Sequence, residues 1–173
     1  MAWLPYIRNY KPFYIECVGD VTAWNTTIYG LVAKTNPYVA LPKPKEPYKN
    51  DWKDEDGDDE YVAAMHYEAF TFQVSFYVKA FDDNTNSTRT KANEAIRSQM
   101  SEFFAKIKEG EFKIYDSYTG IGRQHVRYAG YEEVEDGFVS RDDWARAIFN
   151  VTFKVNDPVT VMKMVNNHIV TVE

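Results

Sequence analysis

Residues 67–81 read YEAFTFQVSFYVKAF, and the fold that we expect is built around this segment. From Phe70 to Ala80, apolar side chains occupy every second position and mostly polar side chains lie between them. A period of two is typical of a strand with one face on the core and the other nearer to solvent. At ~3.3 Å per residue the strand would be roughly 45 Å long, well above the usual ~5–6 residues. A strand this long can extend beyond its own domain, so the pattern favours assembly over catalysis.

The sequence after the long strand predicts a helix that packs on it. Residues 82–87 form a polar turn, and Ser87 or Thr88 can cap a helix from Arg89 to Lys108. The apolar residues of this helix repeat at helical spacing and form one stripe: Ala92, Ile96, Met100, Phe103 and Ile107. Gly110 is a suitable stop. The apolar faces of strand and helix can therefore pack on each other.

Further strands are expected towards the C-terminus. Residues 112–118 and 123–131 read as two strands, and residues 132–143 as a polar loop. Residues 144–156, WARAIFNVTFKVN, alternate like the long strand. They are its natural antiparallel partner.

A second helix is expected from Asp20 to Lys34. Asp20 can cap it, and its apolar residues recur at helical spacing: Val21, Trp24, Ile28, Leu31 and Val32. Residues 1–19 read as an extended arm. Its apolar side chains need to be buried, either against the rest of the chain or against a neighbouring subunit. Four prolines in residues 37–48 confine any strand there to an edge. Residues 49–61 read as an acidic flexible loop, and residues 157–173 as a C-terminal tail that could form a further strand.

These elements define the expected fold class, which is α+β. We expect a mixed, mostly antiparallel sheet with one very long strand, packed against two helices. The length of 173 residues and the hydrophobic content of 45% suit a single domain.

The charge of the chain is concentrated in one place. The net charge is −6, and residues 51–60, DWKDEDGDDE, contain seven acids and one lysine. The rest is near neutral and has no basic arm, which argues against nucleic-acid binding. One cysteine, Cys17, excludes an internal disulfide framework. No apolar run is long enough for a signal peptide or a membrane span, so we expect no membrane partner and folding in a cytosol.

No catalytic, cofactor or metal site is predicted. The pair Gly120 and Gly122 lacks the third glycine and the following helix of a phosphate-binding loop, and a hairpin or bulge is the better interpretation. Asp54, Asp56 and Asp58 resemble a calcium loop, but the position that needs glycine holds Asp59, which favours a solvated loop. The histidines are scattered without metal-ligand spacing: His66, His125 and His168.

Charged and aromatic side chains instead suggest a subunit interface. The basic candidates are Arg123, Arg127, Arg141 and Arg146. Arg123 and Arg127 share a parity and would project from one strand face. They are complementary to the acids at positions 54, 56 and 58 of another copy. The alternative is a set of weak ion pairs within the chain. The long strand adds Phe70, Phe72, Tyr77 and Lys79.

Two segments carry a resemblance to a known family. They are YEAFTFQVSFYVKAFDD (67–83), followed by the helix that opens with TRTKANEAI, and RDDWARAIFNVTFKVNDPV (141–159). With the expected first helix, their order resembles the tail-terminator or neck proteins of tailed bacteriophages, the lambda-type family and its contractile-tail relatives. In that family the second segment is the closing strand, with an arginine–alanine pair, here Arg146 and Ala147, before alternating apolar residues. The resemblance covers about residues 20–160.

The resemblance implies a structural virion protein without enzymatic activity or cofactor. Such a subunit forms a six-membered ring that caps the tail tube and joins it to the head connector. DNA passes through the ring without specific binding. The protein would lie in the virion, after assembly in the host cytoplasm. Another tail-completion or connector protein, a small-ligand or carbohydrate-binding domain, and a hydrolase built from scattered histidines and acids remain as alternatives.

Overall fold

The computed structural model describes residues 12–35, 42–46, 48–50, 59–61, 66–81, 89–141 and 144–172. A ten-stranded sheet dominates it, with the order β2-β1-β7-β8-β10-β6-β3 and β9, β11 and β12 attached beside this path. The strands of this sheet are β1 (Phe13–Cys17), β2 (Trp24–Asn25), β3 (Leu31–Thr35), β6 (Phe70–Phe81), β7 (Phe112–Asp116), β8 (Ile121–Glu133), β9 (Val139–Ser140), β10 (Trp144–Val155), β11 (Met162–Val165) and β12 (His168–Thr171). Every pairing between them is antiparallel.

The long strand and its partner are confirmed. β6 has 12 residues and pairs with β10 along its whole length, from Phe70 opposite Val155 to Phe81 opposite Trp144. Alternate side chains of β6 are buried in the core: Phe72, Val74, Phe76, Val78 and Ala80. The matching positions of β10 are buried too, so two alternating sequences form one continuous apolar face.

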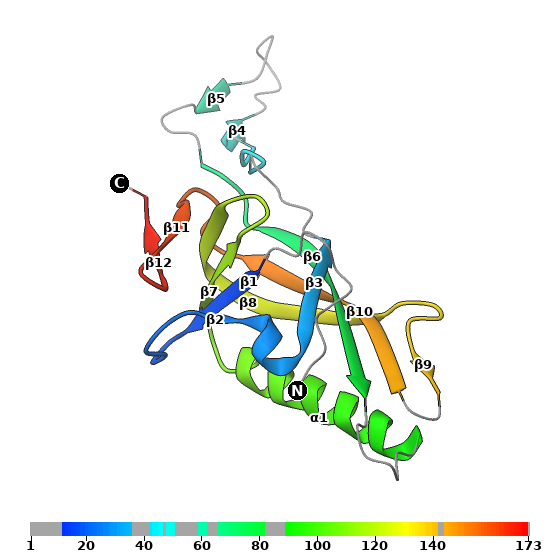
Figure 1. The fold of residues 1–173 in the computed structure, drawn as a ribbon. Helices are drawn as coiled ribbons and strands as arrows, with labels where there is room; N and C mark the ends of the chain where they lie inside the picture. The colour runs from blue at the N-terminus through cyan, green and yellow to red at the C-terminus, as the bar shows by residue number, and fades with distance from the viewer. Residues whose placement is uncertain are drawn as a thin grey trace.

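The helix after the long strand is also confirmed. α1 (Arg89–Ile107) lies across one side of the sheet (Figure 1), where it packs on β6 and β10. Its predicted stripe faces the core, with Met100 partly buried and the other four residues fully buried: Ala92, Ile96, Phe103 and Ile107. At the centre of the core the Phe103 ring lies 5.4 Å from the ring of Phe76.

The predicted helix over Asp20–Lys34 is wrong. The segment instead forms β2, a 3-10 helix η1 (Thr26–Tyr29) and β3, and α1 is the one α-helix in the described part of the chain. Asn25 caps η1, and Gly30 ends it at a φ of 72°, which an L side chain rarely adopts. The apolar positions also do not share one buried face, since Val21 is 87% and Ile28 63% exposed. Helical spacing over so short a stretch was therefore coincidental.

The two ends of the described chain are built into the sheet. β1, in the expected N-terminal arm, pairs with β2 and β7, and Phe13 and Ile15 are covered by the body of the same chain. β11 and β12, in the expected tail, form a hairpin that packs Met162 and Ile169 beneath it. In the acidic loop, β4 (Tyr48–Asn50) pairs with β5 (Asp59–Tyr61), and residues 51–58 lie outside the described residues.

Asp157 fixes the turn that leads from β10 to the C-terminal hairpin. Its carboxylate accepts hydrogen bonds from Gln124 Nε2 at 2.7 Å and from the backbone N–H groups of Val159 and Thr160. Burial alone would raise the pKa of this carboxyl, but the hydrogen bonds outweigh burial and lower its pKa from 3.8 to about 2. The charged form is therefore favoured in the folded protein.

We expect Asp157→Asn to lower the stability at neutral pH by on the order of 1–2 kcal/mol. A carboxyl with a lowered folded-state pKa contributes stability above its unfolded pKa and loses it as the pH falls through the folded value. The difference in Tm between the two proteins should therefore be largest above pH ~4 and shrink towards pH ~2. Thermal unfolding across this range measures it, and a difference that stays constant with pH would exclude a charge-dependent role.

Candidate interaction surfaces

Arg123 and Arg127 do not share a face of the sheet. β8 contains a bulge at this point: Phe112 lies opposite Val126, and Ile114 lies opposite Arg123. His125, with a φ of 51°, is the extra residue of the bulge. The bulge shifts the alternation by one position, which turns Arg123 towards the buried face and leaves Arg127 on the outer face. The prediction that both project from one face is wrong.

Arg123 binds the backbone of its own chain. Its side chain is 2% exposed. Its Nη1 donates hydrogen bonds to the carbonyl oxygens of Thr160 at 3.1 Å and Val159 at 3.4 Å. Its guanidinium carbon lies 5.9 Å from the centre of the Phe70 ring. Arg123 therefore fastens the C-terminal segment to β8 and is not available to a neighbouring subunit.

The outer face of the central strands carries a set of basic side chains, which we call the cationic sheet face. It consists of Lys79, Arg146, Lys154 and Arg127. Arg146 lies directly opposite Lys79, and Lys154 directly opposite Arg127. Like charges opposite each other on a sheet are mildly destabilising. Lys79 Nζ lies 4.7 Å from the centre of the Trp144 ring. Arg127, Arg146 and Lys154 are therefore the side chains suited to an anionic partner.

The other predicted interface residues are dispersed. Phe72 is buried against Phe153, with ring centres 5.6 Å apart, and so belongs to the core. Tyr77 lies on the outer face, where burial raises the pKa of its hydroxyl. Arg141 is exposed in the loop before β10. The acids at 54, 56 and 58 lie outside the described residues.

One edge of the long strand is paired only in part within the described residues. β3 pairs with β6 opposite Ser75 to Val78. Along Phe70–Val74 no strand in the described part of the chain pairs with the side of β6 that faces away from β10. Where no strand pairs with it, the edge of a sheet can accept a strand from another chain.

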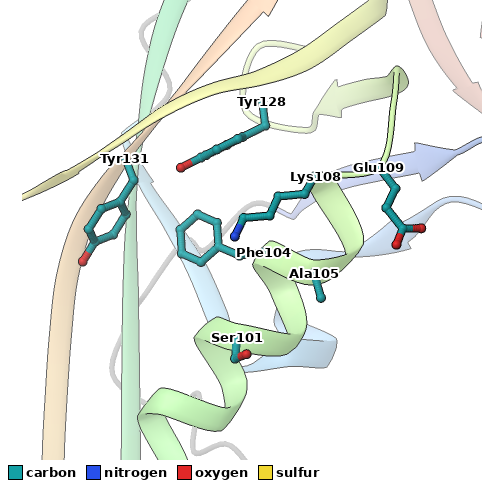
Figure 2. A pocket seen from close by; sticks show the side chains of 7 residues that line it. All are labelled: Ser101, Phe104, Ala105, Lys108, Glu109, Tyr128 and Tyr131. Carbon is teal, nitrogen blue, oxygen red and sulfur yellow. The ribbon is translucent and has the colours of Figure 1, made fainter.

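A groove with aromatic walls lies between α1 and β8, and it was not foreseen from the sequence. We call it the aromatic groove. Its volume is about 570 Å³, and it is lined by Ser101, Phe104, Ala105, Lys108, Glu109, Tyr128 and Tyr131. Figure 2 shows the rings of Phe104, Tyr128 and Tyr131 around one space, with Lys108 reaching along it. The Phe104 ring lies 5.7 Å from that of Tyr128 and 5.4 Å from that of Tyr131.

On another side of α1, residues 17–22 form a rigid turn between β1 and β2, which we call the valine turn. The Asp20 carboxylate accepts hydrogen bonds from the Cys17 backbone N–H at 2.8 Å and from the Trp24 indole at 2.9 Å. Its other oxygen lies 2.6 Å from Lys106 Nζ, which ties the turn to α1. Although burial alone would raise the pKa of Asp20, these bonds lower it. The turn exposes Val18 by 92% and Val21 by 87%.

Neither a metal centre nor a membrane span is found in the described part of the chain. No group of three or more potential metal ligands lies together among these residues. His125 Nδ1 is 2.7 Å from Glu111, and His168 lies 4.0 Å from Glu16, so two histidines have separate carboxylate neighbours. Burial raises the pKa of the Cys17 thiol to about 11, which keeps it protonated. No described helix is both long and apolar enough to cross a membrane.

Comparison with known proteins gives a likeness of fold. No known family's sequence pattern matches the chain, and no curated protein sequence matches it. Among solved structures, the fold is similar to that of the Dit protein of SPP1, described as a paradigm of the hub adsorption apparatus in phages that infect Gram-positive bacteria. The TM-score is 0.56 at 15% identity, over 88% of this chain and 52% of the Dit chain. The fold of this chain is therefore similar to that of about half of the Dit chain.

Proposed function

We propose that the chain is a structural subunit of a bacteriophage tail that assembles into a ring on the tail tube. The observation that carries this proposal is the fold similarity to a tail hub protein over 88% of the chain. Its role would be architectural and would need neither catalysis nor a cofactor. The ring, of six subunits, would contact the tail tube protein and leave a lumen through which DNA passes without specific binding. The protein would lie in the virion, after assembly in the host cytoplasm.

Two features of the sheet support self-association. Along Phe70–Val74 no described strand pairs with the edge of β6 that faces away from β10, and a strand from a neighbour would fit there. The cationic sheet face is complementary in sign to residues 51–60, whose seven acids carry much of the negative charge of the chain. Contacts between different surfaces of identical subunits produce rings when the rotation closes.

Within the tail, we favour the hub over the neck. The resemblance to tail terminators included a first helix over residues 20–34, where the structure has β2, η1 and β3. The terminator position remains as the second candidate, because the long antiparallel pair of β6 and β10, with Arg146 and Ala147 near its start, matches the expected closing strand. In that case the ring would contact the head connector.

Antibody labelling of intact virions tests the tail assignment and separates the two positions. An antibody raised against this chain should mark the distal tip of the tail if the ring belongs to the hub. Label at the junction of head and tail would instead support the terminator. Absence of the protein from purified, disrupted virions would contradict the proposal that it is a tail component.

A further inference from the structure

We propose that the valine turn of one copy inserts into the aromatic groove of the next copy, and that this head-to-tail contact propagates the ring. The inference rests on the proposed ring and names the two surfaces that would build it. Neither surface was among the residues that the sequence suggested for an interface. Both consist entirely of described residues, and each is formed within a single chain.

The valine turn has the properties of an anchor. Val18 and Val21 are the two most exposed of the large apolar side chains described in this chain, at 92% and 87%. Valines so exposed gain free energy when a partner covers them. The turn that carries them is held in place by the three bonds of Asp20. Gly19 adopts a φ of 89° there, a conformation that residues with a side chain rarely adopt. Little conformational entropy would therefore be lost on insertion.

The aromatic groove has the properties of a receptor for small apolar side chains. Three rings form its walls, and Tyr131 is 39% exposed although it is large and aromatic. Burial and the nearby carboxylate of Glu133 raise the pKa of the Tyr131 hydroxyl, which keeps it neutral. A volume of about 570 Å³ is within the range of pockets that take up a compact ligand. Aromatic residues of this kind are enriched where proteins meet.

The placement of the two surfaces prevents them from meeting within one copy. The valine turn is tied to α1 through Lys106. Ser101 and Phe104, which line the groove, lie about 140–160° around the helix from Lys106 at ~3.6 residues per turn. The turn and most of the groove thus lie on different sides of the last turns of α1. A contact between two different surfaces, pointing in different directions, joins subunits head to tail and can close into a ring.

Two variants, each with one surface disabled, test this contact by native mass spectrometry. The turn variant Val18→Asp/Val21→Asp places charge on the anchor, and the groove variant Ser101→Trp fills the receptor. Ser98→Trp is the matched control for the groove, because Ser98 is also exposed on α1 but does not line it. Val165→Asp/Val172→Asp is the control for the turn, because both valines are exposed elsewhere, at 41% and 44%. Circular dichroism checks that every variant is folded.

We expect the wild type and both controls to form rings, and each disabled variant alone to stay monomeric. A mixture of the turn variant and the groove variant should give a dimer and nothing larger, because one intact groove and one intact turn remain. If either folded variant forms rings as the wild type does, the contact is wrong, while the ring proposal stands. If the wild type itself does not assemble at the highest soluble concentration, both proposals fail together.

Discussion

Phe103→Ala is expected to lower the free energy of unfolding by ~3–5 kcal/mol, the range for removing a buried phenylalanine ring. Phe103 is 0% exposed and lies where α1 meets the sheet. Its ring is 5.4 Å from the rings of both Phe76 and Phe104, and 6.3 Å from that of Tyr29. The substitution would leave a cavity between the helix and β6. Since domains are stable by only ~5–15 kcal/mol, a large share of the total would be lost.

Urea unfolding followed by circular dichroism measures this change. Phe138→Ala is the matched control, because Phe138 is 54% exposed in the loop between β8 and β10. Its free energy of unfolding should change by no more than ~0.5 kcal/mol. Equal effects of the two substitutions would mean that α1 does not pack on the sheet through Phe103.

Arg123→Ala is expected to destabilise the chain by roughly 3 kcal/mol, whereas Arg127→Ala should leave stability within ~0.5 kcal/mol of the wild type. Loss of the buried guanidinium leaves the carbonyl oxygens of Val159 and Thr160 without this donor and opens a cavity beside Phe70. The Arg127 side chain is exposed on the outer face. The sequence predicted the same interface role for the two arginines. Because of the bulge in β8, we expect Arg123 to stabilise the fold and Arg127 to have little effect on stability.

Chemical denaturation of the two variants separates these alternatives. Hydrogen exchange of residues 157–172 adds a local measure, since Arg123 fastens this segment to β8. Faster exchange there in Arg123→Ala, with no change in Arg127→Ala, would support the assigned role. If both variants were as stable as the wild type and self-association fell in both, Arg123 would belong to an interface after all.

The sequence predicted the centre of the fold well, for a physical reason. Residues 70–80 and 144–155 alternate over their whole length, and α1 carries a stripe from Ala92 to Ile107 that repeats over about four turns. Patterns of this length specify both the type of element and the face that is buried. The pairing of β6 with β10 then follows, because each needs a neighbour with a matching apolar face.

The misses have local causes. Over residues 20–34 a short helical spacing competed with Asn25 and Gly30, whose backbone preferences end a helix early. In β8 a bulge at His125 reversed the alternation between Arg123 and Val126, and a second register shift between Tyr128 and Gly130 reversed it again. The bulge is therefore why Arg123 was assigned to the surface.

The candidate interaction surfaces could not be predicted from the sequence. The aromatic groove joins α1 to the far end of β8, and nothing in either segment alone indicates that Phe104 and Tyr131 meet. Val18 was assigned to the extended arm and Val21 to a helix, and their exposure became visible only with the turn that Asp20 organises. Surfaces made by two elements depend on the tertiary arrangement, which local patterns do not encode.

Native mass spectrometry of the wild-type chain over a concentration series, with negative-stain imaging of any large species, is the most direct test of ring formation. We expect one discrete closed oligomer of six subunits, seen as a ring with an open centre. A strict monomer at every concentration, or an open series of sizes without a closed species, would contradict the claim that this chain is a ring-forming tail subunit.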